Sequence, residues 1–350
     1  MDQMLADFAV EEGLDRWDIA VIHQIVQMEE ERLGLDRNFS LHKYTDQQCK
    51  DHFRFFPQDI IRLCQLLHMP DRMTAVNRTS ASGLEVLCIV LKRLSYPCRY
   101  LDLEGFFHRP RFELCMLFNL GVNHIDGMFS ERLTNPAQPW LTIAKLHEYS
   151  AAVYAKGAPL NLCWGFIDGT VRKMCKPQVH QREVYNGHKR VHALKFQSVV
   201  TPNGLIANLF GPMPGRRHDA ALLNASGLMD YMEANMNTQD GRPFCVYGDP
   251  AYPLRPHLQR PHRGQRLTAA QQQHNTDMSR VRQAVEWQFG KIVSLWAFVD
   301  FANNLKLNLS PVGKLYRLGA LLTNCHACLY GNQTSDYFGL NPPSLDEYLY

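Results

Sequence analysis

Hydrophobic residues in the first 150 positions recur at the three- and four-residue spacing of amphipathic helices. This spacing predicts helices over residues 15–33, 57–67 and 80–94. Ser80 stands at the N-cap position of the last of these, where a serine hydroxyl can accept a bond from a free amide of the first turn. We therefore expect residues 1–150 to form an all-α N-terminal domain.

A short helix, a break and a longer helix are predicted within the same region. Apolar spacing places the two helices over residues 102–107 and 112–125. Arg109-Pro110 separates them, because proline lacks the amide that would continue the first helix. This order fits a DNA-binding helix-turn-helix, and it fits equally well two packed helices that do not contact DNA.

The hydrophobic pattern changes after residue 150. Short apolar runs with the length of strands stand at residues 162–167, 194–200, 205–210 and 244–247. Thr201-Pro202-Asn203-Gly204 is a turn sequence between the second and third runs, so these two should form a hairpin. Helical spacing returns over residues 218–232. Strand, hairpin, helix and strand in this order predict a mixed α/β sheet.

A long amphipathic helix is predicted over residues 276–299. Its buried stripe consists of apolar residues at helical spacing, namely Val285, Phe289, Ile292 and Trp296. Glu286 lies beside this stripe, where the helix should meet the sheet. We expect residues 151–332 to form one domain and residues 333–350 a C-terminal tail.

The composition is that of an ordinary folded protein. The chain has 350 residues, of which 45% are hydrophobic and 20% charged, and its formal net charge is only +3. Any affinity for nucleic acid must therefore come from local basic patches. No apolar run approaches the ~18 residues of a membrane span, and the acidic N-terminus does not have the layout of a secretory signal. Ten scattered cysteines indicate reduced thiols in an intracellular compartment.

Three carboxylates stand in positions that suit metal chemistry. Asp168 and Asp249 each follow a short apolar run, and Glu286 lies on the long helix. Carboxylates that converge from distant parts of a chain form a site for Mg²⁺ or Mn²⁺, because hard cations prefer oxygen ligands. In a two-metal site Asp168 would bridge ions roughly 3.5–4 Å apart, an arrangement that suits phosphoryl transfer.

The segment from Trp164 to Tyr350 resembles the DDE nuclease domain of PIF/Harbinger-type transposases and their domesticated relatives. The resemblance rests on IDGT, YNGHKRVHALKFQ, PNGLI, GRRHDAALL, YGDPAYPL and the R-x-x-x-E-x-x-FG pattern that runs from Arg282 to Gly290. The helical stretch SGLEVLCIVLKRLSYPCRYLDL and the ending YFGLNPPSLDEYL are also similar to this family. Together these motifs cover nearly the whole chain.

This resemblance implies a ribonuclease H-like fold with Asp168, Asp249 and Glu286 as catalytic and metal-binding residues. It also implies cut-and-paste DNA chemistry with Mg²⁺ or Mn²⁺. The chain departs from the commonest pattern at Asp249-Pro250-Ala251-Tyr252, where a Ser-Gly-Tyr run is more usual. Asp219 in GRRHDAALL is either a further metal ligand or a carboxylate that interacts with the dipole of a helix N-terminus.

Basic residues surround the inferred site in the sequence, and their default role is that of a solvated surface. As a group they are candidates for contacts with DNA phosphates. They are Lys189, Arg190, Lys195, Arg216, Arg217, Arg255, Arg260, Arg263 and Arg266.

The sequence therefore predicts a metal-dependent DNA endonuclease or transposase that acts in the nucleus, with the cytoplasm as a second compartment. Because two transposon ends are cut together, we expect at least a homodimer. The resemblance implies a separate Myb/SANT-like DNA-binding partner protein. The main alternative is a domesticated protein that binds DNA or chromatin without catalysis. A weaker one is a ribonuclease or hydrolase acting on another phosphodiester.

Overall fold

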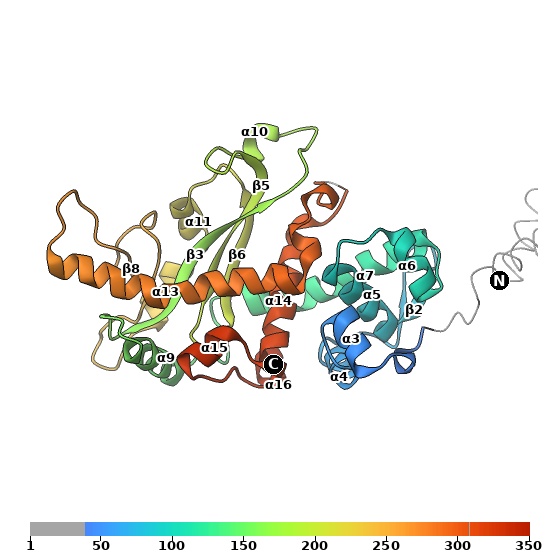
Figure 1. Ribbon diagram of the computed structural model, residues 1–350, viewed down its shortest axis with the longest axis horizontal. Helices are drawn as coiled ribbons and strands as arrows, with labels where there is room; N and C mark the ends of the chain where they lie inside the picture. The colour runs from blue at the N-terminus through green and yellow to red at the C-terminus, as the bar shows by residue number, and fades with distance from the viewer. Residues whose placement is uncertain (1–38, 308) are drawn as a thin grey trace, which may run out of the picture.

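The computed structural model describes residues 39–307 and 309–350. The helix predicted over residues 15–33 lies outside these residues, as does the side chain of Val285 from the predicted buried stripe. The described residues form a helical group at the N-terminal end and a larger group built around a sheet (Figure 1). Among them, no helix combines the length and apolarity that crossing a bilayer requires.

The N-terminal group is mainly helical, as the hydrophobic pattern predicts. Its helices are η1 (Leu41–Lys43), α3 (Asp46–Phe53), α4 (Pro57–Leu66), α5 (Gly83–Ser95), α6 (Tyr100–Phe107) and α7 (Arg111–Phe129). Helix α5 lies at the centre, since α3, α4 and α7 all contact it. Leu87, Val90 and Leu91 on its apolar face are completely buried. The four helices predicted between residues 57 and 125 are thus confirmed.

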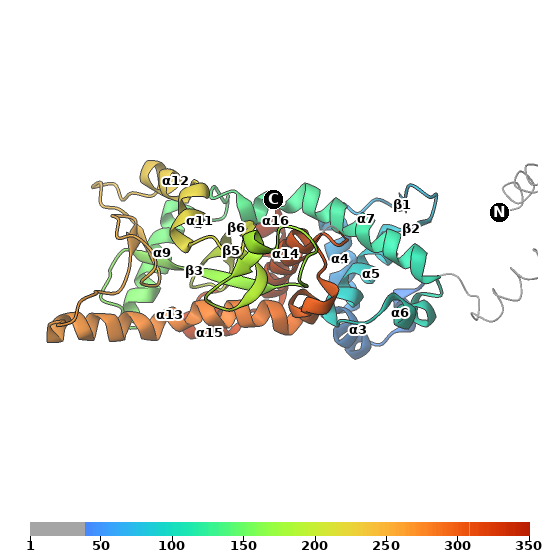
Figure 2. The same ribbon diagram turned by 90° about the horizontal axis from the view of Figure 1, so that it is seen from above.

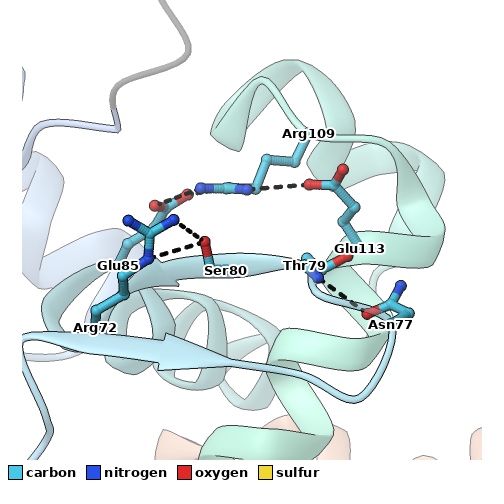
Figure 3. Close-up of polar contacts among 7 residues, drawn as sticks. All are labelled: Arg72, Asn77, Thr79, Ser80, Glu85, Arg109 and Glu113. Atoms are coloured by element: carbon cyan, nitrogen blue, oxygen red, sulfur yellow. Dashed lines mark hydrogen bonds and ion pairs between the residues drawn. The ribbon is translucent and has the colours of Figure 1, made fainter. Parts of the chain in front are cut away.

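The prediction of an all-α N-terminal domain is wrong in one place. A two-stranded hairpin, β1 (Arg72–Thr74) and β2 (Ser80–Ser82), precedes α5. Arg78 in its turn has a left-handed φ of 66°. The side chain of Asn77 accepts a hydrogen bond from the Thr79 amide at 3.2 Å (Figure 3). This local bond favours the turn over a helix, because it offers the backbone an alternative partner.

The hairpin also moves the start of α5. Ser80 lies in β2, where its hydroxyl accepts a hydrogen bond from Arg72 at 2.7 Å. The N-cap of α5 is Ser82 instead, whose hydroxyl accepts from the Glu85 amide at 3.1 Å. The predicted Ser80 cap is therefore two residues too early.

The turn between α6 and α7 is tied to α5 by an ion-paired arginine. Arg109 binds Glu85 of α5 at 2.5 Å and Glu113 of α7 at 3.0 Å (Figure 3). The side chains of Arg109 and Glu85 are only 17% and 7% exposed, so water screens this pair weakly. His108 before it adopts a left-handed φ of 51° and ends α6. The break predicted at Arg109-Pro110 is confirmed.

A mixed sheet forms the centre of the larger group, as the order of predicted elements requires (Figure 1). Its strands are β3 (Cys163–Lys173), β4 (Tyr185–Asn186), β5 (Val191–Val200), β6 (Ile206–Pro214), β7 (Cys245–Tyr247) and β8 (Leu258–Gln259). The order across the sheet is β6-β5-β3-β7-β8, and β4 also pairs with β5. Strand β5 is antiparallel to β3 and β6, whereas β7 is parallel to β3 and β8.

The predicted hairpin is the pair β5 and β6. Its turn begins at Thr201, whose carbonyl accepts a hydrogen bond from the Gly204 amide at 2.9 Å. Gly204 has a φ of +77°, a conformation that glycine adopts at little cost. The turn sequence therefore correctly located this hairpin.

Helices cover both faces of the sheet. They are α8 (Glu131–Thr134), α9 (Ile143–Ala155), α10 (Gln181–Val184), α11 (Asp219–Ala225), α12 (Leu228–Asn235), α13 (Ala269–Leu295), η2 (Ala297–Asp300), η3 (Ala302–Asn304), α14 (Val312–Tyr330), α15 (Gln333–Phe338) and α16 (Leu345–Leu349). Figure 2 shows α13 along one side of the sheet and α11 and α12 on the other. Helices α9 and α13 contact β3, α11 contacts β5, and α14 contacts β6.

Three details of this group differ from the hydrophobic pattern. The helix predicted over residues 218–232 is divided into α11 and α12, because Gly227 adopts a left-handed φ of 65°. Helix α9 continues across residue 150 and packs on β3. Residues 333–350 contain two short helices, and Tyr348 of α16 is fully buried.

The two groups are joined by contacts between buried or half-buried side chains. Arg317 of α14 pairs with Asp126 of α7 at 2.8 Å, and their side chains are 18% and 7% exposed. Arg54, just after α3, donates to the carbonyl of Leu295 at the end of α13 at 3.1 Å. The helical group therefore holds the end of α13 that lies away from the loop after β8.

Candidate active site

The parallel pairing of β3 with β7 brings two of the predicted carboxylates to one place. Phe166 of β3 is paired with Tyr247, the last residue of β7. Asp168 and Asp249 each come two residues after this pair. Since residues in register on parallel strands advance together, the two carboxylates lie at the same edge of the sheet.

Asp168 is not at the end of its strand, contrary to the sequence-based expectation. Strand β3 continues to Lys173 because β5 pairs with it along this stretch, with Asp168 opposite Ser198. Only the pairing with β7 stops before Asp168. The side chain of Asp168 is 19% exposed, so it is held in a strand and still reaches solvent on one side.

Both oxygens of Asp168 have partners in the protein. The amide of Gly169 donates to Oδ1 at 2.9 Å. Arg282 of α13 lies with its Nη2 atom 3.0 Å from Oδ2. Arg282 belongs to the R-x-x-x-E pattern, and the sequence gave no reason to assign it this contact.

Asp219 at the start of α11 reaches the same place. A Cβ atom built on Gly169 would lie 2.4 Å from Oδ1 of Asp219, so this carboxylate packs directly over the Gly169 backbone. Lys195 of β5 pairs with the same oxygen at 2.7 Å. Oδ1 is buried, and among the described residues no group donates it a hydrogen bond of good geometry. Its contact is the ion pair with Lys195. Asp219 is therefore part of the carboxylate cluster as well as the first residue of a helix.

Asp249 is fixed by the turn that follows β7. Its Oδ1 atom accepts a hydrogen bond from the Ala251 amide at 2.9 Å. Tyr252, three residues on, is fully buried. Arg260 donates to the carbonyl oxygens of Tyr252 at 2.9 Å and of Pro250 at 3.3 Å, and so braces this turn. Pro250, the departure from the family pattern, leaves the carboxylate in place.

The electrostatic state of the cluster shows that these groups interact. Burial raises the pKa of Asp168 to about 6, Arg282 and the Gly169 amide oppose this rise, and the charges of Asp249 and Asp219 add to it. Burial also raises the pKa of Tyr252 well above its usual value, and the three aspartates reinforce the effect. Tyr252 is thus a neutral phenol next to the cluster, a neighbour that sequence reasoning did not identify.

Glu286 occupies a different kind of position. It is exposed on α13, four residues after Arg282 and hence about one turn, ~6 Å of helix rise, further along the same face. It is not among the charges that act most strongly on Asp168. The structure therefore brings Asp168, Asp219 and Asp249 together and leaves Glu286 exposed on α13, one turn beyond Arg282.

The donor types of the cluster fit a divalent cation. Mg²⁺ and Mn²⁺ prefer oxygen ligands such as the three carboxylates of this cluster. In addition, the buried Oδ1 atom of Asp219 has no hydrogen-bond donor of good geometry among the described residues. Within residues 39–307 and 309–350, however, no three metal-ligating side chains converge closely enough to hold one ion. Arg282 and Lys195 neutralise two of the carboxylates in this conformation.

The basic residues predicted to contact DNA fall into two sets. Lys195 is only 8% exposed, donates to the Arg217 carbonyl at 3.0 Å and pairs with Asp219. A side chain that contacts DNA phosphate would instead be exposed to solvent in the free protein. Arg255 and Arg260 are half-buried. The exposed members are Lys189, Arg190, Arg216, Arg217, Arg263 and Arg266.

Residues 167–324 match the family model described as DDE superfamily endonuclease. Comparison with curated proteins and with solved structures found no match. The matched segment contains all four candidate acidic residues and most of the sheet. The match supports the assignment of this part of the chain to the DDE endonuclease superfamily.

Proposed function

We propose that the chain is a divalent-metal-dependent DNA endonuclease that cuts and joins transposon ends. The observation that carries this proposal is the convergence of Asp168 and Asp249 from two paired parallel strands, within a segment that matches DDE endonucleases. The sheet order β6-β5-β3-β7-β8, with one antiparallel hairpin and three mutually parallel strands, is consistent with the ribonuclease H-like fold that we propose for this domain.

We assign Asp168, Asp219 and Asp249 to the metal ions, with Glu286 completing the catalytic set from α13. When bound, two such ions activate the attacking water or 3′-hydroxyl and stabilise the leaving oxygen. The protein holds the carboxylates in place: β3 fixes Asp168, Lys195 fixes Asp219, and the Asp249 turn is braced by Arg260. Tyr252 excludes water behind the cluster, because it is completely buried there.

Several residues are placed to bind the DNA backbone. The exposed arginines and lysines lie in the β4–β5, β6–α11 and β8–α13 connections, which flank the carboxylate cluster in the chain. Phosphate contacts of this kind give affinity that falls steeply with salt. We assign a second DNA contact to the helix-turn-helix formed by α6 and α7.

The finer identity of the protein is also part of the proposal. Motifs such as GRRHDAALL and YGDPAYPL favour the PIF/Harbinger type among DDE enzymes, and with it a Myb/SANT-like partner protein. Paired cleavage of two ends requires at least a dimer, and DNA as the substrate favours the nucleus.

Cleavage of labelled terminal-repeat DNA in Mg²⁺ or Mn²⁺ tests this function. We expect wild-type activity and a loss of at least ~10³-fold in Asp168→Ala, Asp249→Ala and Glu286→Ala, since each removes a group that acts on the reacting phosphate. Asp240→Asn is the matched control, because Asp240 is exposed and its partners Thr238 and Arg242 belong to its own turn. Equal cleavage by all five proteins would refute the assignment.

A second candidate function is favoured by one observation. Arg282 and Lys195 already neutralise Asp168 and Asp219, as expected of a transposase-derived protein that binds DNA or chromatin without catalysis. This candidate predicts salt-dependent DNA binding in the wild type with no turnover in either metal. Cleavage that depends on Asp168 would exclude it.

A further inference from the structure

We propose that Arg282 is a positioning residue that holds Asp168 in the metal-free protein and competes with a divalent cation for its Oδ2 atom. The inference rests on the proposed function in one respect, since it takes Asp168 to be a metal ligand. It adds a role for a residue that the sequence presents only as part of a motif.

Each oxygen of Asp168 already has one partner in the protein, so a cation that binds either oxygen meets that partner. The Gly169 amide occupies Oδ1 at 2.9 Å, and Arg282 occupies Oδ2 at 3.0 Å. The backbone amide belongs to strand β3 and moves only with the strand. The guanidinium is at the end of a long side chain, so it is the partner that a cation can displace.

The second cation of the cluster is held more firmly and provides a contrast. Lys195 pairs with Asp219 at 2.7 Å and also donates to the Arg217 carbonyl at 3.0 Å, with only 8% of its side chain exposed. Arg282 is 20% exposed, and among the described residues its buried Nε atom has no hydrogen-bond partner. Arg282 would therefore lose fewer contacts than Lys195 if its side chain moved away from the cluster.

The charge balance of the cluster gives the direction of the effect. Three carboxylates face two cationic side chains, a formal charge of −1 before any metal binds. Removal of Arg282 makes this charge −2 and frees one oxygen. A divalent cation should then bind more tightly, because its attraction to the cluster rises and its competitor is gone.

Metal binding to the full-length protein without DNA tests this inference. We expect Arg282→Gln to tighten Mn²⁺ binding by ~10-fold, a factor that corresponds to about 1.4 kcal/mol. Binding is followed through the electron paramagnetic resonance signal of free Mn²⁺. Arg280→Gln is the matched control: it removes the same charge from the same helix, but Arg280 is 59% exposed and pairs with Asp277. The control should bind Mn²⁺ as the wild type does.

Thermal unfolding gives a second readout. In EDTA, Arg282→Gln should melt below the wild type, since the carboxylates lose a counter-charge. Saturating Mn²⁺ should raise its melting temperature by more than that of the wild type. An arginine with only a structural role would lower stability without improving the response to metal.

The wild-type protein provides a test that does not depend on a variant being stable. The Nε–H resonance of Arg282, assigned by its absence in Arg282→Lys, should shift when Mg²⁺ saturates the protein. Unchanged resonance, or Mn²⁺ binding in Arg282→Gln no tighter than in Arg280→Gln, overturns the inference. Asp168→Asn separates the two proposals: if it leaves Mn²⁺ binding intact, the metal-site assignment in the proposed function fails as well. If it abolishes binding while Arg282→Gln does not tighten it, only the role of Arg282 is refuted.

Discussion

The contact between Gly169 and Asp219 makes a sharp test of the carboxylate cluster. In Gly169→Ala the new methyl group would lie 2.4 Å from Oδ1 of Asp219, where 3.0 Å is the lower limit for such a contact. The carboxylate must therefore retreat by at least 3.0 − 2.4 = 0.6 Å. Gly169 lies in β3 without a positive φ, so alanine adds no backbone strain and the effect is confined to this contact.

The size of the effect follows from two terms. Overpacking of this kind costs ~1–3 kcal/mol of stability, and Asp219 cannot retreat without lengthening its 2.7 Å pair with Lys195. A misplaced ligand on the scale of 1 Å reduces catalysis by up to ~10²-fold. We expect Gly169→Ala to cleave DNA 10- to 100-fold more slowly, at about that limit, and to bind Mn²⁺ more weakly.

A double-mutant cycle identifies the cause. Asp219→Ala removes the carboxylate that the methyl group meets, so Gly169→Ala should have little further effect in that background. Gly105→Ala on α6 is the control, because its added Cβ meets nothing within 4 Å. It should bind Mn²⁺ as the wild type does and gain up to ~1 kcal/mol of helix stability. Full activity in Gly169→Ala, or the same loss in both backgrounds, would show that Asp219 does not take part.

Two further predictions concern stability. Burial lowers the pKa of Lys291 to about 8 from its usual 10.5, so its charge destabilises the fold at neutral pH and this cost disappears as the pH rises from 8 to 10.5. The free energy of unfolding of the wild type, measured with denaturant, should therefore rise relative to that of Lys291→Met over that interval. The rise should be on the order of 1–2 kcal/mol after solvent screening. A difference that stays constant with pH would contradict this explanation. Ser82→Ala should destabilise the protein by ~1 kcal/mol, because α5 loses its N-cap. Ser80→Ala should cost less, since the Ser80 hydroxyl accepts its bond from the exposed Arg72. If thermal melts show the reverse order of stability, the cap is at Ser80.

Much of the fold follows from local sequence features. The β5–β6 hairpin is predicted from the Thr201–Gly204 turn, and α5 and α13 from their apolar spacing. The division between α11 and α12 is missed because the apolar period continues across Gly227, while only its left-handed backbone interrupts the helix. The β1–β2 hairpin is missed because its turn depends on Arg78 in a conformation that arginine rarely adopts.

The candidate site is predicted only in part, for a physical reason. The approach of Asp168 and Asp249 follows from two apolar runs that each lead to an aspartate, a pattern visible in the sequence. The place of Asp219 depends on a contact with Gly169, fifty positions earlier, and the sequence therefore left its role open. The pairing of Arg282 with Asp168 and the burial of Lys195 likewise depend on how α13 and α11 pack on the sheet.

The bond between Arg54 and the Leu295 carbonyl gives α13 a mechanical role. The helix is continuous from Ala269 to Leu295, so its end held by the helical group and its turn carrying Arg282 lie ~20 Å apart on a single stiff rod. A tilt of the helical group on DNA would therefore be transmitted along this rod to the guanidinium beside Asp168. DNA binding by the helical group and the position of Arg282 beside Asp168 would then change together.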